Sequence, residues 1–554
     1  MICDYGIDGE AFPQNILLIL YVFVLSAGII SIAGRYLIAR YRLPERIKLA
    51  DIVLGCFLVL LITGAAGVNF LRLFDHRMLR YLGIFLVLFR EFSEFESSRK
   101  LQYLNPAQLF VVSYIVIISL GTVLLMFPNA TYSGISAIDA LFTATSAFCI
   151  TGLVVVETGS SFTPFGQVII LALFQFGGIG IMTFTSFFTY IFTGGSTYGN
   201  SLLLKDMTNS EKIAEVFSTV RIIILFTLAI EAVGALFIYF SLDSQVIPSV
   251  DERIFFSVFH SVSGFCSAGF TLMTDSLYNS LFRFNYSMHL IIAFLFIVGG
   301  LGFPIVHNFF RYVRHYLVNR IMKSRALHVP WVVTINTRIV LITTLILFVA
   351  GTVFFYIFEY DNTLAEHEGA GKIITAFFGA ATPRSAGFNT IDTSALTLPA
   401  LMLVMFLMWI GAGPGSTGGG IRVTTFAISI MNVVSIARGK DRIEAFGREI
   451  SDSSVRRAFA VILFSFIIVG SSIFLISIIE EDRELLAVAF ECFSSYGTVG
   501  LSMGITGELA DASKLIIVFN MFTGRIGMIV IMLALLKKVK HLNYRYPEEN
   551  ISIT

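Results

Sequence analysis

Four short segments share one pattern around a glycine, and they are spread evenly over most of this 554-residue chain. Each segment starts with Phe, has a glycine ten residues later, and has Leu or Phe directly after that glycine. Agreement at such regular spacing indicates an internal repeat, so we expect the chain to fold as four related units. The segments are 142–153, 259–270, 377–388 and 490–501, with glycines at Gly152, Gly269, Gly387 and Gly500.

Long apolar runs fill the sequence around these segments. Ten of them reach or approach the roughly 20 residues that a membrane-spanning helix needs. Overall, 56% of the residues are hydrophobic and 14% are charged, against about 45–50% and about 25% in a soluble domain. The sequence therefore predicts an all-α integral membrane protein. The predicted spans are 14–34, 51–71, 107–127, 165–192, 219–241, 287–310, 338–358, 399–436, 457–479 and 513–536.

The charge of the connecting segments alternates along the chain. Those rich in Lys and Arg are 311–338, 438–457 and 537–545; those rich in Asp and Glu are 243–252, 359–368 and 480–484. By the positive-inside rule the basic set is cytoplasmic, so the acidic set faces outside. All four glycine segments fall on the acidic side. The repeats are thus predicted to be parallel and related by an axis along the membrane normal, as a central pore requires.

Each unit is predicted to contain a helix, a short half-apolar helix, the glycine segment and a second helix. The partial negative charge at the C-terminal end of each short helix would favour a cation beside the glycine. Successive backbone carbonyls that point at one axis can replace the water shell of an ion. Such a backbone requires positive φ at some residues, which glycine tolerates. The alternative is that these glycines only let helices pack closely. The predicted short helices are 137–148, 253–264, 371–382 and 484–495.

The second helix of each unit carries a repeat of its own. Glycines bracket two residues at 177–180, 299–302 and 524–527, whereas the third unit has the long interruption 411–420. At the N-terminus, the basic segment 35–48 should be inside, so span 51–71 would carry the chain outside. Span 107–127 must start inside to place its glycine segment outside, so the chain must cross the membrane once more between residues 71 and 107. The weak apolar segment 79–94 would do this, which predicts three extra helices and an outside N-terminus. The alternative is two extra helices with a basic loop outside.

The glycine segments resemble the four filter segments of the Trk/Ktr/HKT superfamily of potassium transporters. The matching residues are Thr151-Gly152-Leu153, Ala268-Gly269-Phe270, 385–389 and 498–502, and the resemblance covers about 105–540. The bacterial Trk/Ktr membrane subunits (TrkH/KtrB-like) are the most similar branch. The resemblance implies four M1–P–M2 units (helix, pore helix, helix) around a pseudo-fourfold central pore, in a homodimer with two separate pores. It also implies residence in the bacterial inner membrane.

The resemblance assigns K⁺ coordination to backbone carbonyls of the four segments. Relatives that prefer sodium often have serine at the first filter glycine, so Gly152 implies a potassium preference. A calcium-type channel is not expected, because no ring of acidic side chains lies in the filter segments. The implied filter residues are Ile150, Thr151, Gly152, Ser267, Ala268, Gly269, Ser385, Ala386, Gly387, Thr498, Val499 and Gly500.

The interruption in the third unit cannot remain a stable helix, because it combines many glycines with a proline. The resemblance identifies it as an intramembrane gating loop beneath the filter; the alternative is a static break in the helix. A formal GxGxxG match at 413–418 is not a nucleotide site, because no strand precedes it. The loop residues are Gly411, Gly413, Pro414, Gly415, Ser416, Thr417, Gly418, Gly419 and Gly420.

Two arginines, Arg525 and Arg384, lie near the glycine motifs and are candidates for a role in the pore. Arg525 replaces the second residue of a glycine motif in mid-helix, and a cation embedded in a membrane usually faces a cavity or a partner. The resemblance places it in the pore just below the filter, as a barrier to cations. Arg384 precedes the third filter segment. It is expected either to balance Glu491 at the pore mouth or to be solvated outside.

The expected domain organisation follows the repeats. The first 104 residues hold the extra N-terminal helices, and the last residues form a cytoplasmic tail. The four pore units lie between them, the third with its interrupted second helix. The ranges are 1–104, 105–195, 215–312, 336–438, 455–540 and 541–554.

The function expected is gated, passive uptake of potassium. The alternatives are a Na⁺- or H⁺-coupled K⁺ symporter, for which inverted repeats would be more usual, or a Na⁺-permeable transporter of the same superfamily. An enzyme is not expected, because the sequence has no HExxH motif and no cluster of His, Asp and Glu in its apolar core. The five cysteines form no CxxC pair, so metal or redox chemistry is not expected.

The only small species that this reading requires is the transported K⁺, and no cofactor is expected in the chain. The resemblance implies a separate cytoplasmic ring subunit (RCK/KTN, TrkA/KtrA-like) that binds nucleotide and controls the gate. The basic cytoplasmic segments would offer a docking surface for it, or they only set the topology. A net charge of +1 gives no reason to expect nucleic-acid binding.

Overall fold

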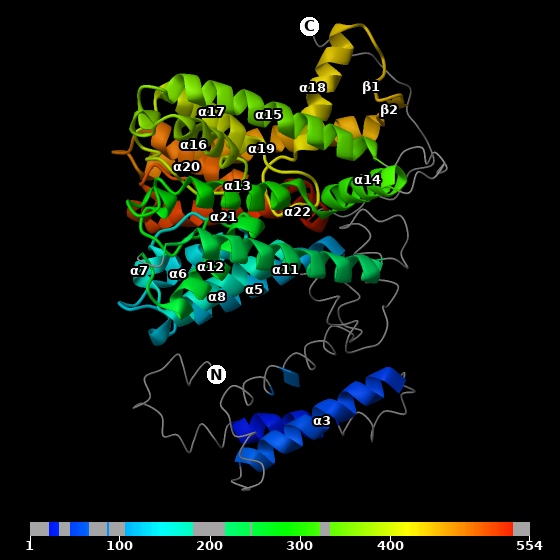
Figure 1. The fold of residues 1–554 in the computed structure, drawn as a ribbon, viewed down its shortest axis with the longest axis vertical. Helices are drawn as coiled ribbons and strands as arrows, with labels where there is room; N and C mark the ends of the chain where they lie inside the picture. Colours follow the sequence, from blue (N-terminus) through cyan, green and yellow to red (C-terminus); the bar gives the residue numbers. More distant parts are fainter. Residues whose placement is uncertain are drawn as a thin grey trace.

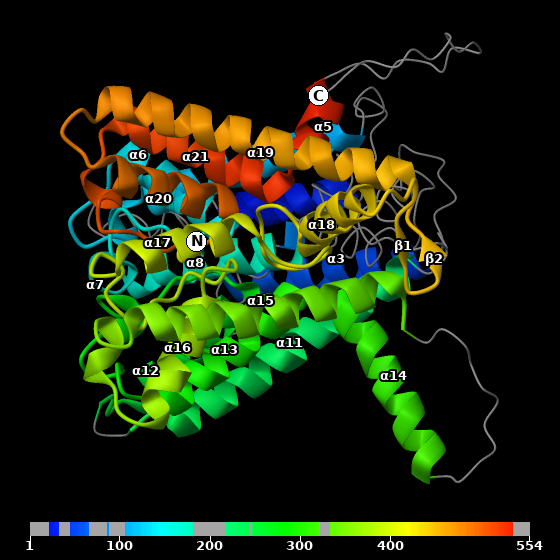
Figure 2. The ribbon, with the colours of Figure 1, turned by 90° about the horizontal axis from the view of Figure 1, so that it is seen from above.

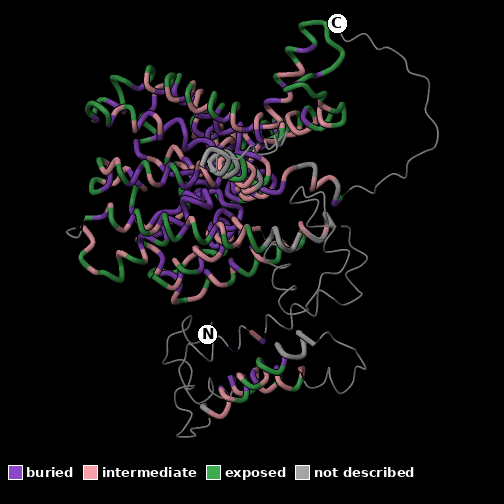
Figure 3. The backbone as a smooth tube through the Cα atoms, turned by 45° about the vertical axis from the view of Figure 1, so that its right-hand side comes forward, coloured by how far each residue is buried: buried purple, intermediate pink, exposed green. Residues whose placement is uncertain are grey.

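The structure is a computed structural model, and it describes residues 21–32, 45–65, 83, 86–87, 106–180, 216–243, 246–321 and 333–535. In these ranges the chain is helical apart from loops and one small antiparallel hairpin, β1 (Glu444–Ala445) with β2 (Arg448–Glu449). The helices of the main body run side by side (Figures 1 and 2). Buried residues gather in the middle of this body, and its outer helices carry the exposed positions (Figure 3).

One order of helices recurs four times along the chain: a helix of 20 residues or more, a short helix, and a second helix. The units are α5 (Pro106–Leu125), α6 (Ala137–Phe148) and α8 (Pro164–Ile179); α11 (Val216–Ser241), α12 (Val250–Cys266) and α13 (Tyr286–Leu301); α15 (Ile335–Glu359), α16 (Ala370–Ala381) and α17 (Leu398–Trp409); α19 (Asp452–Ile479), α20 (Leu485–Gly497) and α21 (Asp511–Ile526). The short helices overlap the four predicted half-helices, which confirms those helices and their order.

Further elements join or follow these units. They are α7 (Thr158–Ser161), α14 (Phe303–Ile321), α18 (Val423–Ala437), α22 (Met528–Leu535) and the single turns η3 (Pro128–Ala130), η5 (Ser276–Tyr278), η6 (Thr363–Glu366) and η7 (Thr506–Glu508). The short helices α6, α12, α16 and α20 lie at one end of the molecule, and α14 and the hairpin lie at the other (Figures 1 and 2). Among the described residues, the acidic connections are therefore at the end of the short helices and the basic connection 438–457 is at the opposite end, as the charge pattern predicts.

Apolar side chains cover the outside of the body. Phe240 is 75% exposed, Phe474 66% and Leu345 63%, all on long helices. In the part of the chain that the structure describes, Arg221–Ser241, Ile335–Glu359 and Asp452–Ile479 are each long and apolar enough to cross a membrane. A hydrophobic exterior on helices of this length is typical of a protein surrounded by lipid.

The second helices of three units are shorter than predicted, because each stops at the last glycine of its motif. The glycines Gly180, Gly302 and Gly527 have φ of 82°, 87° and 84°, which a right-handed helix cannot accommodate. The spans predicted at 287–310 and 513–536 are therefore each broken in two, with a bend of 103° between α13 and α14. Helix α8 ends before the predicted limit of 192, and residues 181–192 lie outside the described residues.

The first glycine of each motif has a different task. A Cβ atom at Gly177, Gly299 or Gly524 would collide with a backbone carbonyl oxygen at the end of the neighbouring short helix. The carbonyls belong to Phe148, Phe265 and Tyr496, each two residues before a filter segment. The repeated motif thus lets each second helix approach its short helix closely and then ends that second helix.

The N-terminal helices pack on one another. Helix Tyr21–Ile32 and α3 (Glu45–Ala65) contribute Leu25, Leu54, Leu58 and Leu61 to a small core that also contains Val87. In Figure 1, α3 lies below the main body. The described residues of the weak segment 79–94 are helical, and a Cβ at Gly83 would meet the side chains of Leu61 and Leu25. This packing agrees with a third helix. The predicted outside N-terminus lies outside the described residues and stays a prediction.

Candidate functional site

Each short helix ends in the same unusual backbone. The first residue of each filter segment, one to four residues after the helix end, has positive φ, the second does not, and the filter glycine again has positive φ. A left-handed conformation costs a residue with a side chain roughly 1–2 kcal/mol, and such strain clusters at functional sites. The pairs of φ values are 57° and 83° at Ile150 and Gly152, 58° and 70° at Ser267 and Gly269, 62° and 78° at Ser385 and Gly387, and 47° and 98° at Thr498 and Gly500.

The four glycines form a closed ring with the carbonyls of their neighbours. A Cβ at Gly152 would lie 2.5 Å from the carbonyl oxygen of Ala268, and one at Gly269 would lie 3.1 Å from that of Ala386. A Cβ at Gly387 would collide with the carbonyl oxygen of Val499, and one at Gly500 with that of Thr151. The contacts run from the first segment to the second, third and fourth, and back to the first. The structure therefore brings all the predicted filter segments together.

Hydroxyl groups near the C-terminal ends of three short helices donate hydrogen bonds to the backbone directly after the filter glycines. Ser146 Oγ donates to the carbonyl oxygen of Leu153 at 2.7 Å, and Ser263 Oγ donates to that of Phe270 at 2.7 Å. In the third unit Thr382 Oγ1 donates to Phe388 O at 2.6 Å. The acceptor is in each case the carbonyl of the residue after the filter glycine. Sequence reasoning missed these contacts, although Ser occurs six residues before the glycine in units one, two and four.

The glycine-rich interruption between α17 and α18 forms a loop with a closed neck. Gly411 N donates to the carbonyl oxygen of Ile421 at 2.9 Å, and Val423 N donates to that of Ala412 at 3.2 Å. The sequence prediction of a broken helix at this place is therefore confirmed. The neck keeps both ends of the loop together.

The middle of the loop packs directly against three of the filter segments. Thr417 Oγ1 lies 3.1 Å from Ser267 Oγ. A Cβ at Gly418 would lie 3.0 Å from Ser385 Cβ, and one at Gly419 would collide with the Thr498 side chain. The three filter residues are those with left-handed φ at the start of their filter segments. Consecutive loop residues thus cover consecutive filter segments.

Backbone hydrogen bonds also join the loop to two neighbouring helices. Gly413 N donates to Gly300 O at 2.8 Å, at the end of α13, and Gly420 N donates to Gly524 O at 3.2 Å in α21. Glycine is needed at Gly413, because a Cβ there would lie 2.6 Å from the carbonyl oxygen of Leu301. The loop is consequently held by contacts with the second, third and fourth units.

Arg525 is buried and faces the loop. Its guanidinium donates to the carbonyl oxygen of Thr417 and, at 2.8 Å, to that of Gly177. Sequence reasoning missed a second arginine, Arg422, whose Nη1 lies 2.5 Å from Gly418 O and 3.3 Å from Gly413 O. Its position directly after the glycine run was the available signal. Arg422 thus joins two parts of the loop by hydrogen bonds, whereas Arg525 joins the loop to α8.

Arg384 does not lie where the sequence suggested. It is only 7% exposed, its Nη2 donates to Gly411 O at 3.3 Å, and its guanidinium lies 4.7 Å from the Phe348 ring centroid. Glu491 instead accepts hydrogen bonds from the segment after the fourth filter glycine. Both expectations, an ion pair with Glu491 and an exposed position, are wrong, because Arg384 follows the buried end of α16 and contacts the loop neck.

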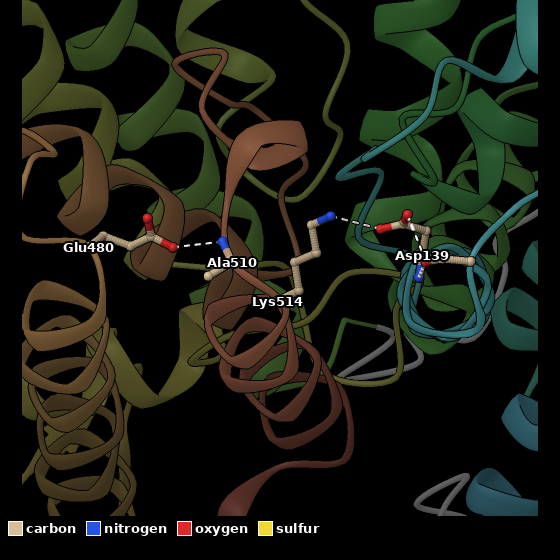
Figure 4. Close-up of polar contacts among 5 residues, drawn as sticks. Asp139, Glu480, Ala510 and Lys514 are labelled. Atoms are coloured by element: carbon tan, nitrogen blue, oxygen red, sulfur yellow. Dashed lines mark hydrogen bonds and ion pairs between the residues drawn. The ribbon is translucent and has the colours of Figure 1, made fainter.

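Ion pairs join neighbouring units at the opposite end from the hairpin. Lys514 Nζ of α21 lies 2.8 Å from Asp139 Oδ1 of α6, and the two side chains are 8% and 20% exposed. Figure 4 shows this pair beside the hydrogen bond from Ala510 N to Glu480 Oε1, which measures 2.7 Å. A second pair, Arg283 with Glu366, joins the second unit to the third. These pairs connect unit four to one and unit two to three.

Comparison with known proteins gives consistent matches. The family model described as "TrkH: Cation transport protein" matches residues 78–544. The Ktr system potassium uptake protein B of Bacillus subtilis is 37% identical over 451 residues, which cover 81% of this chain and 96% of that protein. The potassium/sodium uptake protein NtpJ of Enterococcus hirae is 34% identical over 460 residues, covering 81% and 97%.

A solved structure has a similar fold. The crystal structure of the potassium transporter TrkH from Vibrio parahaemolyticus superposes with a TM-score of 0.61 at 16% identity. The superposition covers 94% of this chain and 97% of that chain. The family model begins at residue 78, so helix Tyr21–Ile32 and α3 precede the matched range.

Proposed function

We propose that this chain, which belongs to the TrkH family of cation transport proteins, takes up potassium across the membrane through a gated, channel-like pore. Because the family consists of ion transporters, the chain is a transporter and not an enzyme. The pore would be formed by the four helix, short helix, helix units as parallel M1–P–M2 repeats around a pseudo-fourfold axis. The observation that carries the proposal is the closed ring of four glycine segments.

Each filter segment would coordinate K⁺ through backbone carbonyls. Three features support this: the paired positive φ values, the mutual contacts of the four segments, and the short helices whose C-terminal ends lie beside them. A carbonyl ring replaces the water shell of a cation without a net charge of its own. The residues from Ile150 to Gly152, Ser267 to Gly269, Ser385 to Gly387 and Thr498 to Gly500 are proposed as the filter.

The loop from Gly411 to Gly420 would be the gate. It packs against three of the filter segments, and hydrogen bonds join it to α13 and α21. Arg525 would add an electrostatic barrier, because a buried cation on the conduction path repels another cation strongly at low dielectric. The loop and Arg525 together would close the path below the filter.

Potassium is proposed as the preferred ion. Gly152 is a glycine, unlike the serine found in sodium-preferring relatives, and the names of both relatives reported above include potassium uptake. The name of NtpJ also includes sodium, and this favours a second candidate, a transporter that couples K⁺ to Na⁺ or H⁺ or that also passes Na⁺.

A flux measurement separates the two candidates. The purified chain is reconstituted into liposomes, and a K⁺ gradient across their membrane is the only driving force. K⁺ uptake is then measured with and without an added Na⁺ or proton gradient. Passive conduction predicts K⁺ flux in all conditions. Flux that requires the Na⁺ or proton gradient would support the coupled symporter instead.

We also propose the partners and the location that the family resemblance implies. Two chains would pair as a homodimer in the bacterial inner membrane, and a cytoplasmic nucleotide-binding ring would act on the gate. The hairpin end of the molecule, with α14 and α18, would be the side that faces such a subunit (Figure 2). Co-purification of the chain with its ring subunit, followed by measurement of the mass of the complex, tests both assemblies.

A further inference from the structure

One buried carboxylate holds the fourth filter segment in a way that has no counterpart in the first and third. Glu491 lies in α20 and is 1% exposed. Its Oε1 accepts hydrogen bonds from Ser502 Oγ at 2.5 Å and from Met503 N at 3.2 Å. Its Oε2 accepts one from Thr506 Oγ1 at 2.9 Å. All three donors belong to the stretch that directly follows Gly500 and Leu501.

The fourth unit lacks the hydroxyl contact of the other three. In units one to three, a Ser or Thr of the short helix donates to the carbonyl after the filter glycine. In unit four, Ser494 Oγ instead accepts from Gly500 N at 3.1 Å. The chain after this glycine is therefore held by Glu491, whose bonds replace the missing one.

The position of Glu491 in the repeat supports this role. It follows the Phe that starts the repeated segment, and the residue at the same place in unit two is His260. His260 Nε2 lies 3.4 Å from Leu272 N, and Leu272, like Met503, is the third residue after its filter glycine. Units two and four, which lie opposite each other in the ring, thus share a side-chain acceptor for the same backbone amide. Units one and three have Thr143 and Phe378 there.

A carboxylate is well suited to this contact. When ionised it only accepts hydrogen bonds, and each bond to a charged group is roughly twice as strong as a neutral one. Three donors converge on it, so its removal would take one hydrogen-bond acceptor from each of them, and Thr506 is itself buried. Among the residues that the structure describes, Glu491 forms no ion pair with a Lys or Arg. Its acceptor capacity is available to the filter segment.

We propose that Glu491 is a positioning residue that fixes the end of the fourth filter segment and thereby sets discrimination between K⁺ and Na⁺. This inference rests on the proposed function of the ring as a filter. A filter distinguishes ions by the number and placement of its carbonyl ligands. A loosened fourth segment could close around the smaller Na⁺, so loss of Glu491 should weaken selectivity more than it weakens K⁺ binding.

The test compares Glu491→Ala and Glu491→Gln with a matched control, Glu508→Gln. Glu508 lies in the same loop, its side chain is 67% exposed, and among the described residues that side chain bonds only Arg483. Calorimetry on the purified full-length chain in detergent gives the K⁺ and Na⁺ dissociation constants. Glu491→Ala should lower the ratio of the K⁺ to the Na⁺ affinity by at least about tenfold, Glu491→Gln by less because it keeps one acceptor oxygen, and Glu508→Gln not at all.

Each outcome is decisive. A wild-type ratio in both Glu491 variants overturns the inference and leaves the proposed filter intact. A wild-type chain that shows no K⁺ preference contradicts the proposed function, and this inference with it. If Glu491→Ala does not fold, Thr506→Val, which removes one donor, should still lower the ratio of the K⁺ to the Na⁺ affinity. A wild-type ratio in both single variants, Thr506→Val and Glu491→Gln, would overturn the inference.

Discussion

The hydroxyl groups of Ser267 and Thr417 lie 3.1 Å apart and join the second glycine segment to the middle of the loop between α17 and α18. Ser267 is a proposed filter residue with left-handed φ, and Thr417 also receives the Arg525 hydrogen bond. Hydrogen bonds therefore connect the proposed filter to the proposed gate. A substitution in the loop should alter the backbone of the filter segments, and a substitution in the filter should alter the position of the loop.

Replacement of Arg525 by alanine should raise K⁺ flux. It removes a buried positive charge and the bonds to Thr417 and Gly177 together. We expect an increase of roughly tenfold or more, since each 1.4 kcal/mol taken from a barrier raises a rate about tenfold. Liposome flux measures this, and Arg525→Lys, which keeps the charge, serves as the control. A fall in flux at normal protein yield would refute the barrier.

A shorter loop should also raise flux. Deletion of 414–417 removes Thr417 but leaves the neck bond between Gly411 and Ile421, so α17 and α18 should stay connected as before. Thr417→Val, which removes only the hydroxyl contact with Ser267, should give a smaller increase. Flux in the same liposome assay checks both. Unchanged flux in the deletion would mean that the interruption is a static break.

Gly152→Ser should reduce the selectivity for K⁺ over Na⁺ by about tenfold or more. A Cβ at Gly152 would lie 2.5 Å from the carbonyl oxygen of Ala268, so the ring must open at that contact. Gly470→Ala is the matched control, because nothing lies within 4 Å of a Cβ at this helical glycine. The ratio of K⁺ to Na⁺ uptake decides the matter. An unchanged ratio in Gly152→Ser would remove that glycine from the filter.

The Asp139–Lys514 pair should stabilise the closure of the ring between units four and one. The pair, drawn in Figure 4, has side chains only 8% and 20% exposed, and hydrogen bonds to charged groups contribute about 1.5–3 kcal/mol. A double-mutant cycle with Asp139→Asn and Lys514→Met, read by thermal unfolding in detergent, should give a coupling energy in that range. Additive effects of the two substitutions would show that the pair contributes nothing to stability.

Acid should weaken the contact between the second and third units. His367, in the loop before α16, is buried and lies 2.9 Å from the Tyr286 hydroxyl. Burial lowers the pKa of His367, and the nearby cations Arg283 and Lys372 lower it further. The unfolded chain therefore binds a proton more readily, so stability is retained above pH of about 6.5 and declines as the pH falls below it.

The variant His367→Asn tests this pH dependence. It keeps a hydrogen-bonding side chain next to Tyr286 but cannot be protonated in this range. Melting temperatures of the purified protein between pH 7.5 and pH 5 should therefore fall less in the variant than in the wild type. Equal slopes for the two proteins would assign the acid sensitivity to other groups.

The short helices and the glycine segments could be predicted because their signal is local and repeated. A glycine at a fixed distance from a Phe marks a backbone requirement, and Gly152 and its three counterparts do carry the positive φ that this reading demands. The broken helix in the third unit was likewise predictable from its proline and glycines. These features depend on residues within one short stretch of chain.

Other features depended on contacts between distant segments. The helix breaks at Gly302 and Gly527 lie inside apolar runs that look continuous, and only the backbone of the fold shows which glycine takes positive φ. The side chain of Arg384 could not be placed from its sequence neighbours, because its partner is Gly411, 27 residues away. Glu491 has the same character, since its donors follow the filter segment and only the fold brings them together.

The most direct measurement of the central claim is the location of bound ions in crystals grown with Rb⁺, a K⁺ substitute with a strong anomalous signal. The account predicts anomalous peaks on the axis enclosed by Gly152, Gly269, Gly387 and Gly500, and their loss when Na⁺ replaces Rb⁺. Peaks that lie elsewhere in the molecule, with none inside this ring, would contradict it.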